Sequence, residues 1–181
     1  MPAKKQTTAA KAHLSSSLED YLEAILRLEA INRVARTKDL ADMLGVNMSS
    51  VTGALKVLVG KDYVDHTPYS FVTLTPKGKE IAEEIFRRHV SLARFLERVL
   101  GIEAELADEN ACRMEHAIGP KVLKKLVNFT RFVEECPIGV KGIIEGFQYY
   151  CKHGRVRPDC SMSVEMCRNN AKPVKKKKDA R

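Results

Sequence analysis

The sequence predicts a mainly α-helical fold with a small β-wing, in which a winged helix-turn-helix precedes a second helical domain. Apolar residues recur at three- and four-residue steps along most of the chain, as they do on the buried face of a helix. The segment 63–75 differs, because β-branched and aromatic residues there flank a Thr-Pro turn signal, as in a hairpin. No apolar run reaches the roughly 18 residues of a membrane span and no secretory signal is visible, so a cytoplasmic location is expected.

The net charge of +8 is unevenly distributed over the 181 residues. Residues 1–13 carry +3 and residues 168–181 carry +6, which leaves −1 on residues 14–167. Binding of nucleic acid by the folded part must therefore be argued from shape and local chemistry. The basic ends, which include the lysine run 175–178, are expected to add only nonspecific affinity for DNA.

The first helix is expected from Ser17 to about Ile31. Ser17 and Asp20 have the spacing of a capping box, with Ser17 as the N-cap. The apolar residues that follow form one helical stripe: Leu18, Tyr21, Leu22, Ile25 and Leu28. The polar residues 1–13 before this helix are expected to form a disordered basic arm.

A helix-turn-helix pattern follows in residues 37–58. Thr37 is expected to cap a short helix that Gly45 ends with a positive φ. Asn47 or Ser49 is expected to cap the next helix. The shared core is expected from Leu40, Leu44, Val46, Val51, Leu55 and Leu58. The second helix of such a motif can enter the major groove of DNA.

The hairpin in 63–75, with its turn at Thr67 and Pro68, forms the wing. Thr75 and Pro76 combine an N-cap with a proline in the first turn, which predicts a long helix to about Leu100. Further helices are expected at 108–116, from Pro120 to before Cys136, and at 138–150. The expected domains are 14–78 for the winged helix and 79–150 for the second helical domain, followed by a cysteine-containing, lysine-rich tail in 151–181.

Three places in the sequence carry residues that can bind a metal ion. Cys112, Glu115 and His116 lie at i, i+3 and i+4, so one helical face presents a thiol, a carboxylate and an imidazole. Asp20 and Glu23 form a second pair at i and i+3, and His89 lies on the long helix. If these helices converge, their mixed donors suit a divalent transition ion.

Each of these residues also has a purely structural interpretation. Asp20 fits as the acid of the capping box, and Glu23 fits as a solvated ion-pair partner of Arg27 at i+4. His89 fits as a hydrogen-bonded helix residue, and Cys112 as a small buried apolar group. Spacing alone leaves the metal site and the structural interpretation open.

The expected DNA-binding face consists of short polar residues and lysines around the two helix N-termini. These residues are Thr37, Lys38, Asn47, Ser49, Ser50, Thr52 and Lys56. Thr37, Asn47 and Ser49 serve equally well as helix caps, which is compatible with either role.

Four late cysteines form a further candidate site for Zn²⁺ or an iron-sulfur cluster. They are Cys136, Cys151, Cys160 and Cys167, and their spacing matches no strong zinc-finger pattern. Unliganded thiols are the alternative, because disulfides are rare in the cytosol.

Five ordered motifs between Leu18 and about Val133, preceded by Ser17, carry a family resemblance. They are Ser17-Leu-Glu-Asp-Tyr-Leu-Glu-Ala-Ile, Val51-Thr, Leu74-Thr-Pro-Lys-Gly-Lys, Arg88-His89 and Ala111-Cys-Arg-Met-Glu-His. With these motifs the chain resembles the iron- and manganese-dependent repressors, the family of the diphtheria toxin repressor and the manganese transport regulator. The resemblance implies a homodimeric transcriptional repressor without catalytic activity. It further implies that a metal ion activates this repressor to bind a near-palindromic operator. It also implies that the second helical domain binds the metal and dimerises.

The resemblance further implies a hybrid ligand set. Asp20, Glu23, His89, Glu115 and His116 match the ligands of the manganese-sensing branch, whereas Cys112 matches a cysteine of the iron-sensing branch. Ala93 and Asp108 stand where the iron branch has a Glu and a His at an ancillary site. Because a thiolate favours Fe²⁺ over Mn²⁺, Fe²⁺ is the expected effector.

Two other functions remain open at this point. The first is a winged-helix regulator that senses redox, iron-sulfur or zinc status through the late cysteines. The second is a metalloenzyme, which ranks far lower because Cys112 replaces the first imidazole of a hydrolase motif and no general base is evident.

Overall fold

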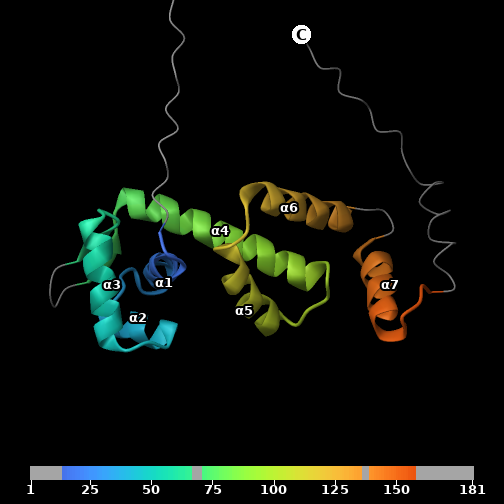
Figure 1. The fold of residues 1–181 in the computed structure, drawn as a ribbon, viewed down its shortest axis with the longest axis horizontal. Coiled ribbons are helices and arrows are strands. Elements are labelled where there is room, and N and C mark those ends of the chain that lie inside the picture. The colour runs from blue at the N-terminus through green and yellow to red at the C-terminus, as the bar shows by residue number, and fades with distance from the viewer. Residues whose placement is uncertain (1–13, 67–70, 136–138, 158–181) are drawn as a thin grey trace, which may run out of the picture. The chain divides into compact units, whose positions relative to one another are not determined.

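The computed structural model describes residues 14–66, 71–135 and 139–157. This part of the chain contains helices and one two-stranded sheet, so the expected mainly helical fold with a small wing is confirmed (Figure 1). The elements are α1 (Ser16–Asn32), α2 (Thr37–Leu44), α3 (Met48–Gly60), β1 (Val64–His66), β2 (Val72–Leu74), α4 (Pro76–Arg98), α5 (Ala104–Glu115), α6 (Pro120–Glu135) and α7 (Gly139–His153). Within these ranges no single helix is long and apolar enough to cross a membrane, although α2 and α3 as a bent pair have the required length and composition.

The chain divides into two compact units inside α4, between Phe86 and Arg87. Unit 1 contains α1 to α3, the hairpin and the first half of α4. Unit 2 contains the second half of α4 with α5, α6 and α7. The boundary drawn from sequence, at residues 78 and 79, lies near the start of α4, because a continuous helical pattern carries no signal of where its packing partners change.

Two of the expected helix caps in unit 1 are wrong. Ser15, not Ser17, is the N-cap of α1, and its Oγ accepts a hydrogen bond from the Leu18 amide at 3.4 Å. Three successive serines offer the same cap, and the helix uses the earliest one. Thr37 is the first residue of α2, which follows Arg36 without a side-chain cap. The reason is that Ala35 is held in a β-bridge to Val72, so the chain enters the helix directly afterwards.

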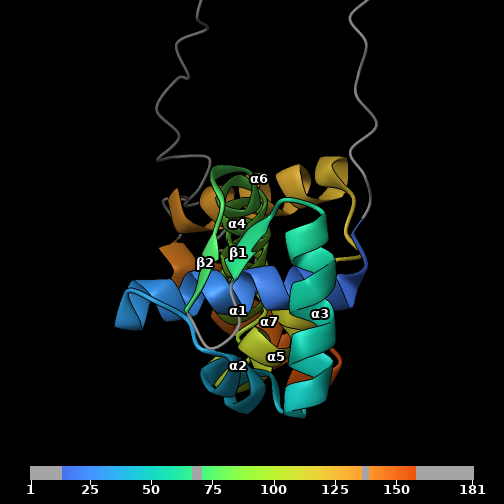
Figure 2. The same ribbon diagram turned by 90° about the vertical axis from the view of Figure 1, so that its left-hand side faces the viewer.

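The turn between α2 and α3 forms as expected. Gly45 has a φ of 64°, and Asn47 caps α3 by accepting a hydrogen bond from the Ser50 amide at 2.8 Å. The expected core residues of the motif are buried or half-buried, with the exception of Val46, which follows Gly45 in the turn and is exposed. Figure 2 shows α3 and α2 with the hairpin strands β1 and β2 in unit 1. The core of this unit is formed mainly by Leu22, Ile25, Leu40, Val51, Leu55, Leu58, Val64 and Val72.

The wing is a short antiparallel pair, in which Val64 lies opposite Leu74 and His66 opposite Val72. The Leu74 amide donates to Oε1 of Glu29 at 2.9 Å, which fastens β2 to α1. The expected turn at residues 67 and 68 lies outside the described residues.

The start of α4 is fixed by Thr75 and Gly78. The Thr75 hydroxyl donates to the Asp62 carbonyl at 2.9 Å and accepts from the Gly78 amide at 3.0 Å, which confirms the expected N-cap. A Cβ on Gly78 would lie 1.8 Å from the Tyr63 carbonyl oxygen. Glycine is therefore required where the helix crosses the chain that leads into β1.

Unit 2 packs small residues of α5 against α4. Ala107 and Ala111 are buried against Leu92 and Leu96, and the small side chains at these two positions let the two helices approach closely. This packing places the last turn of α5 beside α4 near His89. The expected helix from Pro120 to before Cys136 is confirmed as α6, and α7 extends to His153, past the expected end at residue 150.

Candidate metal centre and nucleic-acid interface

His89 on α4 lies between two carboxylates of α5. Its side chain is buried, with Nδ1 2.8 Å from Oε2 of Glu115 and Nε2 2.8 Å from Oδ1 of Asp108. Both ring nitrogens are therefore engaged by acidic groups. An imidazole in this setting is held in one orientation, as metal-binding histidines are by their hydrogen-bonded partners.

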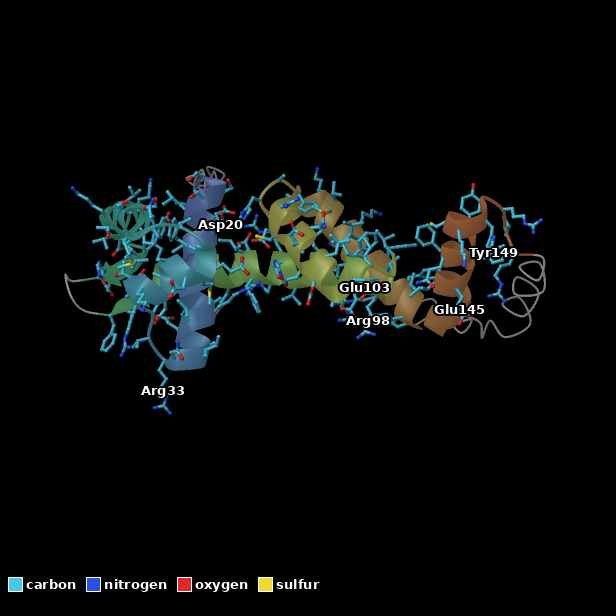
Figure 3. The ribbon with its side chains drawn as sticks, turned by 90° about the horizontal axis from the view of Figure 1, so that it is seen from below. Asp20, Arg33, Arg98, Glu103, Glu145 and Tyr149 are labelled. Atoms are coloured by element: carbon cyan, nitrogen blue, oxygen red, sulfur yellow. The ribbon has the colours of Figure 1, made fainter. Side chains whose placement is uncertain are left out.

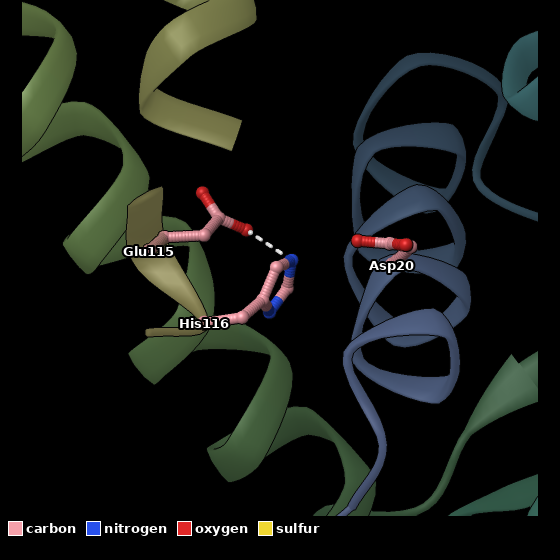
Figure 4. Close-up of side chains that lie close together, drawn as sticks. All are labelled: Asp20, Glu115 and His116. Atoms are coloured by element: carbon pink, nitrogen blue, oxygen red, sulfur yellow. Dashed lines mark ion pairs between the residues drawn. The ribbon is translucent and has the colours of Figure 1, made fainter. Parts of the chain in front are cut away.

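Glu115 is fully buried at the last residue of α5. Its Oε1 lies 3.4 Å from Nε2 of the neighbouring His116, and this ion pair is the dashed line in Figure 4. The Arg88 guanidinium donates to the Glu115 backbone carbonyl at 3.0 Å, which satisfies one of the carbonyls left open at a helix end. A buried carboxylate is costly unless cations or donors surround it, and here two imidazoles do so.

The side chains around Glu115 in unit 2 are of the types that bind a divalent transition ion. Oε2 of Glu115 lies beside Nδ1 of His89 and Oε1 lies beside Nε2 of His116, so the two imidazoles contact different oxygens of one carboxylate group. Imidazole and carboxylate ligands suit Mn²⁺, Fe²⁺ and their heavier neighbours. The sequence pattern singled out all three residues, and the structure places both His89 and His116 beside Glu115.

In unit 1, Asp20 and Glu23 both lie on α1. Figure 3 labels Asp20 on α1 and Arg33 just beyond the C-terminal end of the helix. With Ser15 as N-cap, the capping-box position falls on Leu18, so Asp20 does not have the structural role considered for it. Glu23 pairs with Nη2 of Arg27 at 2.7 Å, as its structural interpretation predicted, but its side chain is buried and not solvated. Burial raises the pKa of Tyr21, and the negative charge of the neighbouring Asp20 raises it further by a smaller amount.

Cys112 differs from the other residues of its motif, because its side chain is exposed on α5. The interpretation of this thiol as a buried apolar group is therefore wrong. The expected role of Cys112 as a ligand stays a prediction.

Asp108 is a residue that the sequence analysis treated only as a departure from the iron branch. It lies seven residues before Glu115, hence on the same face of α5, and this spacing is the signal that could have identified it. Ala93, the other departure, packs against the apolar core of unit 2.

Of the four late cysteines, one lies within the residues that the structure describes. Cys151 lies on α7 and is exposed, whereas Cys136, Cys160 and Cys167 lie outside the described residues. The same holds for the basic arm 1–13 and the lysine run 175–178.

The candidate DNA face is the exposed side of the helix-turn-helix. The side chains of Lys38, Asn47, Ser49, Ser50, Thr52 and Lys56 are exposed, and Thr37 is half-buried. Oδ1 of Asn47 accepts hydrogen bonds from the Ser49 hydroxyl at 2.6 Å, the Ser50 amide at 2.8 Å and the Ser50 hydroxyl at 2.9 Å. The cap interpretation of Asn47 is thus confirmed, and it orders the N-terminus of α3.

A winged helix-turn-helix followed by helices that hold a histidine and carboxylate cluster defines a class of DNA-binding regulators that respond to metal ions. Residues 13–72 match the family described as the iron dependent repressor, N-terminal DNA binding domain. Residues 75–142 match the iron dependent repressor, metal binding and dimerisation domain. The chain belongs to this family of metal-dependent transcriptional repressors.

Individual relatives agree with the family match. The chain is 40% identical to an uncharacterized HTH-type transcriptional regulator of Methanocaldococcus jannaschii over 117 residues, which are 64% of this chain and 94% of that protein. It is 34% identical to the HTH-type transcriptional regulator MntR of Bacillus pumilus over 66% of this chain and 82% of that protein.

Solved structures give the same result. A manganese-dependent transcriptional repressor in complex with manganese has a TM-score of 0.58 at 30% identity, covering 64% of this chain and 53% of that one. The structure of T. acidophilum IdeR has a TM-score of 0.58 at 26% identity, covering 87% of this chain and 63% of that one. The chain thus spans less than two thirds of the length of these solved chains.

Proposed function

We propose that this chain is a homodimeric repressor that a divalent metal ion activates for DNA binding, with His89, Glu115 and His116 at the centre of the metal site. The observation that carries the proposal is the buried Glu115 carboxylate between two imidazoles. Asp20 and Glu23 of α1 complete the site in this proposal, as the family resemblance implies. A cytoplasmic location is part of it.

A site built from both units would couple metal binding to DNA binding. α1 belongs to the unit that carries the helix-turn-helix, whereas Glu115 and His116 belong to the other unit. An ion bound by residues of both units would fix one relative placement of the two recognition helices in the dimer. The ion can shift this equilibrium only by its greater affinity for the DNA-competent state.

The identity of the activating ion depends on Cys112. Carboxylate and imidazole donors accept both Mn²⁺ and Fe²⁺, and affinity rises from the first to the second. The similarity to a manganese-dependent repressor solved with manganese supports Mn²⁺ as the ion of this chain, whereas a Cys112 thiolate would favour Fe²⁺. We retain Fe²⁺ as the prediction to be tested against Mn²⁺ in a panel of divalent ions.

We place α3 in the major groove of a near-palindromic operator. The exposure of Ser49, Ser50, Thr52 and Lys56 on one helix supports this placement. Thr37, Lys38 and the cap residue Asn47 would contact phosphates at the helix N-termini.

Glu115→Gln tests the metal site. It keeps the volume of the buried side chain but removes the anionic ligand, so metal-stimulated DNA binding should be lost while the fold is retained. The matched control is Glu109→Gln, because Glu109 is an exposed carboxylate on the same helix. Fluorescence anisotropy of labelled operator DNA against added Mn²⁺ or Fe²⁺ measures both variants. A full metal response in Glu115→Gln would show that the proposed site is wrong.

Binding of zinc or an iron-sulfur cluster by Cys136, Cys151, Cys160 and Cys167 stays a prediction. Metal analysis and the visible absorption spectrum of the purified protein test it. The family match favours metal sensing through α4 and α5 over sensing through these cysteines.

A further inference from the structure

Gly53 is a glycine that the protein itself does not require. It is the sixth residue of α3, inside the helix and exposed to solvent. A Cβ at this position would meet no atom within 4 Å, and the backbone is not in the left-handed region. Alanine would fit Gly53 without strain and is favoured there, since glycine is among the least favourable residues in a helix interior.

Two other glycines in unit 1 have reasons within the structure, whereas at Gly60, the last residue of α3, no contact excludes a Cβ either. Gly45 has a φ of 64°, and a Cβ on Gly78 would overlap the Tyr63 carbonyl. Gly53 has neither reason. A partner that approaches the helix at this position would explain why a side chain is missing there.

The surroundings of Gly53 point to the base edges of DNA. Gly53 lies one turn after Ser49 and Ser50, on the side of α3 that is not packed by the buried Val51 and Leu55. This side is the one that the proposed function directs into the major groove, so the inference rests on that function. Without a Cβ at Gly53, the backbone of α3 can lie closer to the bases than an alanine would permit.

The side chains beside Gly53 are suited to thymine methyl groups. The Thr52 hydroxyl donates to the Met48 carbonyl at 2.8 Å, so its hydrogen is used within the helix. Val57, one turn further, is an exposed apolar residue. Apolar contact to the thymine methyl is a recognised form of readout in the major groove.

The side chains that usually read guanine or adenine are missing or occupied in this stretch. Residues 48–57 contain no arginine, asparagine or glutamine. Lys56 is the one positively charged residue among them. Asn47 has its Oδ1 engaged by the cap hydrogen bonds of Ser49 and Ser50, which excludes the bidentate contact to adenine that also uses this oxygen.

We propose that Gly53 determines operator specificity: it brings α3 close enough for Thr52 and Val57 to contact thymine methyl groups, so the base pairs facing Gly53 are A·T pairs.

The test uses the full-length protein with Mn²⁺ and duplexes that it selects from a randomised DNA pool. Gly53→Ala is compared with Gly146→Ala, because Gly146 also lies inside a helix, α7, where a Cβ would meet no atom within 4 Å. We expect Gly53→Ala to raise Tm by about 2–4 °C, as removal of a helix glycine should. We expect its affinity for the selected duplex to fall at least about tenfold, as for loss of one good base contact. Gly146→Ala should leave this affinity unchanged.

A second measurement replaces the selected thymines by deoxyuridine, which removes only the methyl group. Wild-type affinity should fall several-fold, and Gly53→Ala should lose less on the same replacement. Unchanged affinity in Gly53→Ala, or an unchanged affinity for the uridine duplex, would overturn the inference. Lys56→Ala separates this failure from a failure of the proposed function: if Lys56→Ala also binds normally, α3 is not the DNA-binding helix.

Discussion

Nε2 of His89 lies 2.8 Å from Oδ1 of Asp108, on the ring edge opposite to the one that faces Glu115. If Nδ1, the nitrogen beside Glu115, is the one that binds an ion, Nε2–H donates to Asp108. A carboxylate in this position fixes the tautomer and the orientation of a ligating imidazole. Asp108 is therefore assigned as a positioning residue of the proposed metal site.

Asp108→Asn should weaken activation by metal without abolishing it. Loss of such an outer partner costs about 10- to 100-fold in metal affinity. The concentration of Mn²⁺ or Fe²⁺ at half-maximal DNA binding should rise accordingly, while maximal binding at saturating ion stays the same. Glu109→Gln, one residue further along α5, is the control. A lowered maximum with an unchanged midpoint would contradict a positioning role.

The sequence predicted those parts of the fold that have strong local signals. Pro76 and Pro120 each occupy the first position of a helix, where a missing amide hydrogen costs nothing, and both helix starts are observed as expected. The capping-box spacing to Asp20 favours Ser17 as the cap of α1, but the helix begins after Ser15, which has no acid at the matching position. Arg36 precedes α2 in place of a polar cap because of the distant pairing of Ala35 with Val72.

The candidate site was predictable to the extent that helical spacing determines it. Glu115 and His116 follow from their motif, but their proximity to His89 depends on the packing of α5 against α4 through small alanines. Cys112 and Glu115 are three residues apart and still differ in burial, since this spacing leaves them about 60° apart around the helix axis. Asp108 is largely exposed, and the seven-residue spacing that puts it on the same face of α5 as Glu115 is the one sequence signal that separates it from the other acids of this helix.

Cys112→Ser distinguishes the two candidate ions. If the thiolate is a ligand, its loss weakens binding of the softer Fe²⁺ more than that of Mn²⁺. We expect the half-maximal Fe²⁺ concentration to rise at least about tenfold and that for Mn²⁺ to change less than about twofold. Anaerobic titrations monitored by DNA binding provide both values. Identical behaviour of the variant toward both ions would remove Cys112 from the ligand set and the preference for Fe²⁺ with it.

Gly78→Ala should destabilise unit 1 strongly. The new Cβ would lie 1.8 Å from the Tyr63 carbonyl oxygen, so either α4 or the entry into β1 must move. Overpacking against backbone costs about 3 kcal/mol. Urea unfolding followed by circular dichroism measures the change in the free energy of unfolding. Gly60→Ala is the matched control, because a Cβ on Gly60 would meet no atom within 4 Å. Equal stability of the two variants would show that α4 can shift at its start with little cost.

Deletion of residues 168–181 should weaken DNA binding without changing its sequence preference. This segment carries a net charge of +6, and the folded part of the chain has no comparable excess. Each phosphate contact that is lost reduces the dependence of log K on log salt by about 0.9, so six charges reduce it by at most about 5. Because phosphates are the same at every site, selected and unrelated duplexes should lose affinity by the same factor at a given salt concentration. Titrations of both duplexes between low and physiological salt measure the two slopes. A loss confined to the selected duplex would mean that residues 168–181 contact bases, which would contradict the nonspecific role proposed for them.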